Sequence, residues 1–137
     1  MKRQEMAEFT LSVNGKEYAV RQLAELRSHL AASRHQQFCE LWLNRKNEGA
    51  LSALVNGDRA WLMFLRYEGD AGFSSRNPHY VGRQDAELEF YLSNGQRDVY
   101  PAHWAVDTSQ ALKAMEYFYL NGERSPAIVW HDDSTRL

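Results

Sequence analysis

Cysteine, proline and long apolar runs are scarce in this sequence of 137 residues. Its one cysteine, Cys39, excludes an internal disulfide and a cysteine-based zinc site, and it is typical of a reducing compartment. The longest apolar run, Ala60 to Leu65, is six residues, whereas a membrane span needs about 20. The first residues also lack the apolar segment of a signal peptide. We therefore expect a cytoplasmic protein with no membrane segment.

Neither sign of charge dominates the chain. Sixteen Lys and Arg residues stand against eighteen Asp and Glu residues, which gives a net charge of −2. A dedicated nucleic-acid binder needs a basic excess to neutralise phosphates, so the balance argues against nucleic acid as the partner. The apolar share of 44% is ordinary for a globular chain, and the length predicts a single domain over residues 1–137.

Short alternating runs predict an antiparallel sheet built from hairpins. Asn14-Gly15 separates two such runs near the start of the chain, and Asn94-Gly95 separates two more. Asn-Gly between alternating segments is a strong hairpin signal. The expected strands cover residues 9–13, 16–20, 39–44, 50–56, 59–67, 87–93, 96–100 and 127–130. The run from Ala60 to Leu65 is apolar on both faces, which predicts a strand covered on two sides.

Two segments have the period of a helix. Leucines at positions 23, 26 and 30 predict a helix from about residue 21 to 32. Asp107 with Gln110 three residues later predicts the start of a second helix, which should end at Asn121-Gly122. The expected fold is therefore α+β, with about six to eight strands and two packed helices. Residues 131–137 are expected to be a frayed tail.

Between Tyr67 and Asp85 neither period is present, and connections of this length are functional or disordered in most domains. The segment mixes charges, aromatic rings and glycines, which is typical of a protein-recognition surface. Its candidate contact residues are Glu68, Asp70, Phe73, Ser74, Ser75, Arg76, Asn77 and Tyr80. The alternative is a self-packed loop in which Arg76 pairs with Asp70.

Catalytic and metal-binding patterns are weak. Cys39 falls in an alternating strand, where a buried inert thiol is expected, and the five histidines lack zinc-site spacing. A small enzyme using Glu68, Asp70 and His79 is one alternative, and a nucleic-acid binder is another. The binder would use Arg66, Arg76 and Arg83, with Phe73 and Tyr80 stacking on bases. We expect no metal and no cofactor.

Three stretches of the sequence resemble a known family. They are Leu65 to Pro78 (LRYEGDAGFSSRNP), Phe90 to Trp104 with its FYLSNGQ run and Tyr100-Pro101, and a closing part with Ala111-Leu112, Tyr117-Phe118, NGERSP at 121–126 and Trp130. Together they resemble the first-numbered immunity-protein family of bacterial polymorphic toxin systems. The resemblance covers about residues 40–133, and the N-terminal hairpin and first helix lie outside it.

The resemblance implies a non-enzymatic inhibitor that binds a cognate secreted toxin. Members of this family are associated with nucleic-acid deaminase toxins, among others. A deaminase holds a flipped base in a pocket flanked by basic contacts, so an inhibitor can plug the pocket or cover the channel. The implied contact surface is the Glu68 to Tyr80 loop, together with Trp104, Trp130 and Asp132. The oligomeric state is left open.

Overall fold

Ten strands and two α-helices make up residues 8–134, the part of the chain described by the computed structural model. In chain order they are β1 (Phe9–Val13), β2 (Lys16–Val20), α1 (Leu23–Ser33), β3 (Phe38–Arg45), β4 (Ala50–Asn56), β5 (Arg59–Leu65), β6 (Phe73–Arg76), β7 (Glu87–Tyr91), β8 (Arg97–Pro101), the 3-10 turn η1 (Ala102–Trp104), β9 (Val106–Asp107), α2 (Thr108–Asn121) and β10 (Val129–Asp132). The main sheet has the order β10-β6-β5-β4-β3-β1-β2, with β9 paired to β5, and β7 and β8 form a separate ribbon. Every strand pair is antiparallel, so the predicted α+β fold is confirmed.

Both Asn-Gly pairs lie in the connection of a hairpin, as the sequence predicts. Val13 pairs with Lys16 across the first turn, where Asn14 and Gly15 have φ of 50° and 87°. Two consecutive positive φ values are the requirement of the tight turn that matches strand twist, and Asn-Gly meets it at little cost. Gly95, at φ 91°, closes the turn between β7 and β8. The local sequence thus sets the register of the first hairpin, whereas five residues connect Tyr91 to Arg97 in the second.

The second helix begins and ends where its capping residues predict. The Asp107 backbone N–H donates to Oε1 of Gln110 at 3.2 Å, as part of a capping box. At the other end Gly122 has φ 71°, and its N–H donates to the Phe118 carbonyl at 2.7 Å. The first helix has a capping box from Gln22 and Glu25, which the sequence analysis did not identify.

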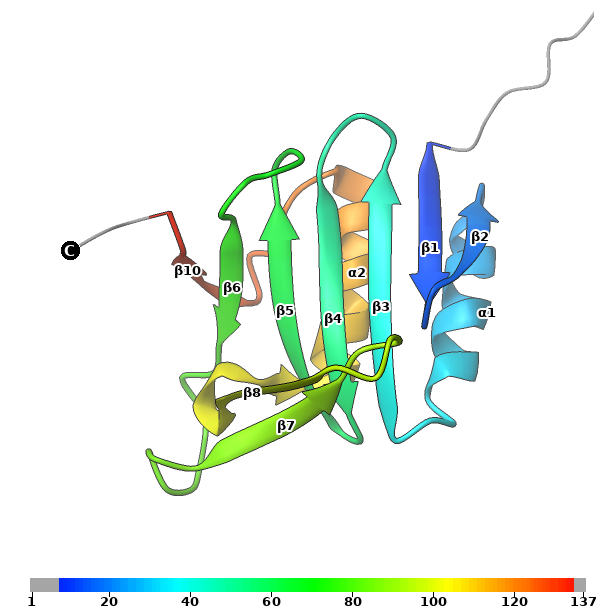
Figure 1. Cartoon of the computed structure of the whole chain (residues 1–137). Coiled ribbons are helices and arrows are strands. Elements are labelled where there is room, and N and C mark those ends of the chain that lie inside the picture. The colour runs from blue at the N-terminus through cyan, green and yellow to red at the C-terminus, as the bar shows by residue number, and fades with distance from the viewer. Residues whose placement is uncertain (1–7, 135–137) are drawn as a thin grey trace, which may run out of the picture.

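Different elements pack on the two faces of the sheet. The helices lie behind the sheet in Figure 1, and the β7–β8 ribbon crosses in front of one end of it. The larger core, on the helix side, includes Leu11, Leu41, Leu62 and Phe118. The smaller core joins Leu54 and Trp61 of the sheet to Phe90 of the ribbon. Strand β5 contributes to both cores, which confirms the strand covered on two sides.

The structure differs from expectation at β6 and β10, and the two-residue strand β9 was not expected either. Strand β6 lies inside the segment expected to be an irregular loop, because the run Phe-Ser-Ser-Arg lacks the apolar alternation that marks a strand. Its serine side chains are bonded within the fold, so a polar strand is stable there. Strand β10 continues to Asp132, two residues into the expected frayed tail, because it pairs with β6. Residues 135–137 of that tail lie outside the described residues.

Candidate partner-binding surface

An ion pair between Arg66 and Asp70 closes the loop that follows β5. The Asp70 carboxylate accepts hydrogen bonds from Nε and Nη2 of Arg66 at 2.8 and 2.9 Å, and from the Arg66 backbone N–H at 2.9 Å. The side chain of Asp70 is 1% exposed. The hydrogen bonds from Arg66, together with one from the Gly72 backbone N–H, hold the pKa of this carboxyl well below its usual range. Asp70 therefore pairs internally, with Arg66 and not with Arg76.

Strand β6 buries three of the predicted contact residues. Phe73, Ser74 and Ser75 are 9%, 1% and 0% exposed, because the strand lies between β5 and β10. The Ser75 hydroxyl accepts the Leu62 backbone N–H at 3.0 Å and donates to the Trp104 carbonyl at 2.8 Å. A buried hydroxyl with both bonds made holds neighbouring segments together. These three side chains are thus part of the sheet and its cores, and not of the exposed surface.

Arg76 connects β6 to η1. Its guanidinium carbon lies 3.9 Å from the ring centroid of Trp104, a stacked cation–π contact. Its Nη1 donates to the Ser74 hydroxyl and the Ser75 carbonyl, at 3.0 and 2.8 Å. Burial lowers the pKa of Arg76, and the nearby charge of Asp133 opposes that shift. Trp104 and Arg76 are half-buried, so each keeps part of its surface exposed.

The C-terminal strand brings Trp130 and Asp132 beside β6. The Trp130 indole N–H donates to the Ser125 carbonyl at 2.9 Å, and its ring packs on the larger core. Asp132 pairs with Phe73 in the register of β6 and β10, and its carboxylate accepts the Ser134 backbone N–H at 3.0 Å. Both side chains are half-buried.

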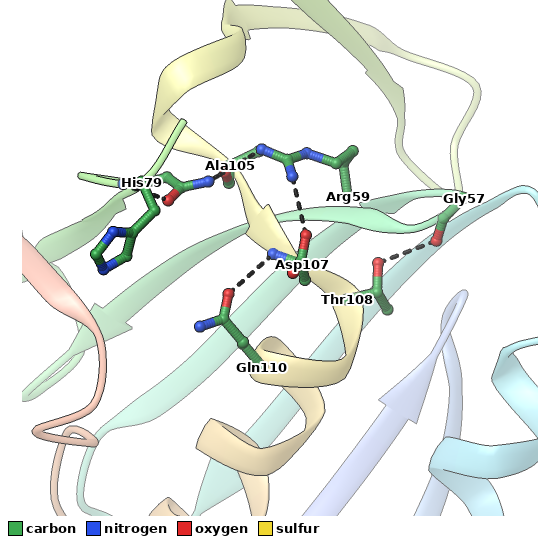
Figure 2. Close-up of polar contacts among 8 residues, drawn as sticks. Gly57, Arg59, His79, Ala105, Asp107, Thr108 and Gln110 are labelled. Carbon is green, nitrogen blue, oxygen red and sulfur yellow. Dashed lines mark hydrogen bonds and ion pairs between the residues drawn. The ribbon is translucent and has the colours of Figure 1, made fainter. Parts of the chain in front are cut away.

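Asn77 and Tyr80 lie at one end of β6, beside a hollow of about 580 Å³. It is lined by Arg59, Asn77, His79, Tyr80, Val81, Asp107 and Gln110. Hydrogen bonds join several of the polar lining residues (Figure 2). Arg59 donates to the Asp107 carboxylate at 2.9 Å and to the Ala105 carbonyl at 2.8 Å. Asn77 donates to the same carbonyl at 3.1 Å. Val81, which also lines this hollow, is 94% exposed.

Glu68 lies beyond the opposite end of β6. It is exposed and borders a second hollow, of about 570 Å³, near the turn between β3 and β4. The predicted residues therefore do not form one continuous surface. Glu68 lies near one end of β6 and Asn77 and Tyr80 lie near the other, whereas Trp130 and Asp132 lie on β10 beside β6.

Two aromatic residues that were not among the predicted contact residues, Trp42 and Tyr67, line the second hollow. Trp42 lies on the same face of β3 as Glu40 and Asn44, opposite the buried leucines of that strand. This position on the polar face of the strand is a signal that the side chain lies away from the larger core. Tyr67, 57% exposed, directly follows the apolar strand and carried no such signal.

The candidate acid–base residues Asp70 and Glu68 lie in different surroundings. Asp70 is held ionised by Arg66, so it is a poor proton donor, and Glu68 is exposed. Cys39 is 1% exposed, as expected. Burial first, and then the charge of Glu40, raises its pKa to about 11, which keeps the thiol protonated. Among residues 8–134, no group of three or more His, Cys, Asp or Glu side chains is placed to hold a metal ion.

The alternative nucleic-acid set is also dispersed. Arg66 is paired with Asp70, and Arg83 is paired with Asp85 at 2.8 Å. Arg76 is stacked on Trp104, and Phe73 is buried. The five residues of this hypothesis therefore do not present free cations and stacking rings on one face.

Neither described helix is long and apolar enough to cross a membrane.

The antiparallel sheet with two helices on one face defines an α+β fold, and the hollows described above lie near the two ends of β6. A family model described as Immunity protein Imm1 matches residues 14–132, and the chain belongs to this family. The match confirms the resemblance and extends it, because it also includes β2 and α1. The protein is therefore an immunity protein. A comparison with curated proteins gives no match.

Proposed function

We propose that this immunity protein binds a cognate bacterial toxin and stops it by covering its active site or its substrate channel. Membership of the immunity family, over residues 14–132, is the observation that carries this proposal. The two open hollows support it, because concave surfaces with mixed polar and aromatic linings suit recognition of a protein loop.

The predicted contact residues take two roles within this proposal. Those with exposed or half-exposed side chains touch the toxin: Glu68, Asn77, Tyr80, Trp104, Trp130 and Asp132. Those whose side chains are bonded or packed within the fold keep that surface in shape: Asp70, Phe73, Ser74, Ser75 and Arg76. A motif shared across a family can preserve the fold in this way while the contacts differ between members.

The proposed toxin is a nucleic-acid deaminase. Such an enzyme binds a flipped base between basic contacts, which exposed carboxylates of an inhibitor can neutralise. Glu68 is one such carboxylate. The net charge of −2 favours a few local contacts over mimicry of a whole polyanion. Inhibition by occlusion needs no catalysis, cofactor or nucleic acid on the side of this protein, and it would take place in the cytoplasm.

The proposal is tested by co-expressing this chain with the toxin domain encoded next to it. We expect cells to survive only when both are present, and the two chains to co-elute on size exclusion. A purified toxin assay then measures deamination of single-stranded DNA and RNA with increasing amounts of the immunity protein.

Each outcome addresses one part of the proposal. Rescue with a stable complex supports immunity by direct binding, and loss of deamination at one equivalent supports occlusion. Rescue of a toxin that cleaves nucleic acid without deaminating it would overturn the toxin class alone. If neither rescue nor a complex is seen, direct neutralisation of this toxin is wrong.

A further inference from the structure

The β7–β8 ribbon covers one end of the sheet face opposite the helices and leaves the other end open (Figure 1). At the covered end Asn56 Nδ2 donates to the Glu89 carbonyl at 2.9 Å, and the Phe38 and Tyr91 rings meet at 4.8 Å. The last contact of the ribbon with β3 is the hydrogen bond from the Ser93 backbone N–H to Oε1 of Glu40, at 2.9 Å. Beyond that bond the strands lie in front with no element over them (Figure 1).

The hollow of about 570 Å³ lies at this open end of the face, near the turn between β3 and β4. In the sheet register Trp42 pairs with Ser52, and two residues further along Asn44 pairs with Ala50 and Ala50 with Leu65. All of these side chains point to the face that carries the ribbon. Ala50 and Leu65 form an apolar floor, Trp42 an aromatic wall, and Tyr67 and Glu68 a rim that follows β5.

The Trp42 ring is fixed in place. Its indole N–H donates to Oε2 of Glu40 at 2.9 Å, and Glu40 in turn holds the Ser93 turn. The ring is half-buried, so part of it remains open to the hollow. A rigid aromatic wall costs little entropy when a partner packs on it. Tyr67 also lines the hollow, and more than half of its surface is exposed.

The charges around the hollow favour binding of a positively charged group. Within residues 8–134 the Glu68 carboxylate has no hydrogen bond or ion pair. Arg45 also borders the hollow, but its Nε contacts Glu8 at 2.8 Å and its Nη1 contacts Glu48 at 3.1 Å, so two carboxylates neutralise it. Arg66 is neutralised by Asp70. The rim therefore carries a net negative charge next to two aromatic rings.

We propose that this hollow receives an arginine side chain from a loop of the partner protein, stacked between Trp42 and Tyr67 and paired with Glu68. A planar guanidinium can pack on an aromatic face and donate two hydrogen bonds to a carboxylate at the same time. The apolar floor of Ala50 and Leu65 accommodates the methylene stem of that side chain. This inference rests on the proposed function, since it names the toxin as the partner.

The test measures the affinity of a catalytically inactive toxin domain for the wild type and three variants, by titration calorimetry. We expect Glu68→Lys to weaken the complex by at least about tenfold, because it places two cations together. Tyr67→Ala should weaken it by about tenfold through loss of the stacking face. Glu17→Lys, the same charge change on exposed β2, is the matched control and should leave affinity within about twofold.

Salt dependence separates a charge contact from a change of shape. Glu68→Gln keeps the size of the side chain and removes its charge, so its affinity should fall less with added NaCl than that of the wild type. Wild-type binding itself tests the proposed function. If the wild type binds and both Glu68→Lys and Tyr67→Ala bind equally well, the toxin contacts another surface and this inference is overturned while the immunity function stands.

Discussion

The guanidinium carbon of Arg124 lies 3.6 Å from the ring centroid of Phe73. On the same ring, Arg66 lies at 5.0 Å. Phe73 belongs to the Gly-Phe-Ser-Ser run after β5, and Arg124 belongs to the Gly-Glu-Arg-Ser-Pro run after α2. The two stretches that most clearly carry the family resemblance are therefore in direct contact, and part of what they encode is this contact within the fold.

Replacing Arg124 should destabilise the protein without unfolding it. Arg124→Ala removes the stacked cation and exposes one face of Phe73, so we expect the free energy of unfolding to fall by about 1–2 kcal/mol. Urea denaturation followed by tryptophan fluorescence measures the change. Arg21→Ala, at an exposed position before α1, is the control and should change the stability by less than about 0.5 kcal/mol. Equal losses in the two variants would show that the Phe73 contact adds nothing.

The ion pair at Asp70 predicts how stability depends on acid. The pKa of Asp70 is lowered in the folded state, chiefly by its bonds from Arg66, whereas in the unfolded chain it is about 3.9. The pair therefore stabilises the fold fully above about pH 4, and this stabilisation is lost as the pH falls toward the lower folded-state pKa. Asp70→Asn should lower the melting temperature at pH 7 and flatten its fall below pH 4.

A control isolates the effect of burial in that experiment. Asp85 is paired with Arg83, but its side chain is 70% exposed. Asp85→Asn should leave both the melting temperature at pH 7 and its acid dependence close to those of the wild type, because exposed pairs contribute little. If the two variants have the same acid dependence, the buried pair at Asp70 is not its source.

The elements with strong local signals could be predicted from the sequence. The Asn-Gly turns need positive φ and the capping residues Asp107 and Gln110 bond within their own helix, so neighbouring residues decide both. Strand β6 was missed because its stability is not local. In the sequence Ser74 and Ser75 resemble loop residues. Their hydroxyls are bonded only in the folded chain, that of Ser74 to Asp133 and that of Ser75 to β5 and η1.

The site was predicted less well, for the same reason. The sequence places Glu68 and Tyr80 in one loop, but the strand between them carries them to opposite ends of the sheet. Trp42 borders the hollow with Glu68 although 26 positions separate them, since β3, β4 and β5 are adjacent in the sheet. One sequence without its pairing register cannot show such neighbours.

Two glycines of the Gly-Asp-Ala-Gly run provide a matched pair of substitutions. Gly69 and Gly72 both have positive φ, at 85° and 79°, so alanine costs about 1–2 kcal/mol in backbone strain at either position. A Cβ on Gly69 would meet nothing within 4 Å, but one on Gly72 would lie 2.5 Å from the Phe64 carbonyl oxygen. Thermal denaturation should show a moderate loss for Gly69→Ala and a much larger one for Gly72→Ala. Similar losses would mean that backbone strain alone makes these glycines necessary.

Ser75 should be the most sensitive of the serines in β6. Its hydroxyl accepts the Leu62 N–H in the sheet and donates to the Trp104 carbonyl, and the side chain is fully buried. Ser75→Ala leaves both groups without that partner, and an unsatisfied buried group costs about 1–3 kcal/mol. Ser28→Ala, on the exposed side of α1, removes a hydroxyl from solvent and should be neutral or slightly stabilising. Urea denaturation of both variants measures the difference. Because Ser75 joins β5 to η1, hydrogen exchange should also quicken at the Leu62 amide in Ser75→Ala, and an unchanged rate there would show that the hydroxyl does not hold the two segments together.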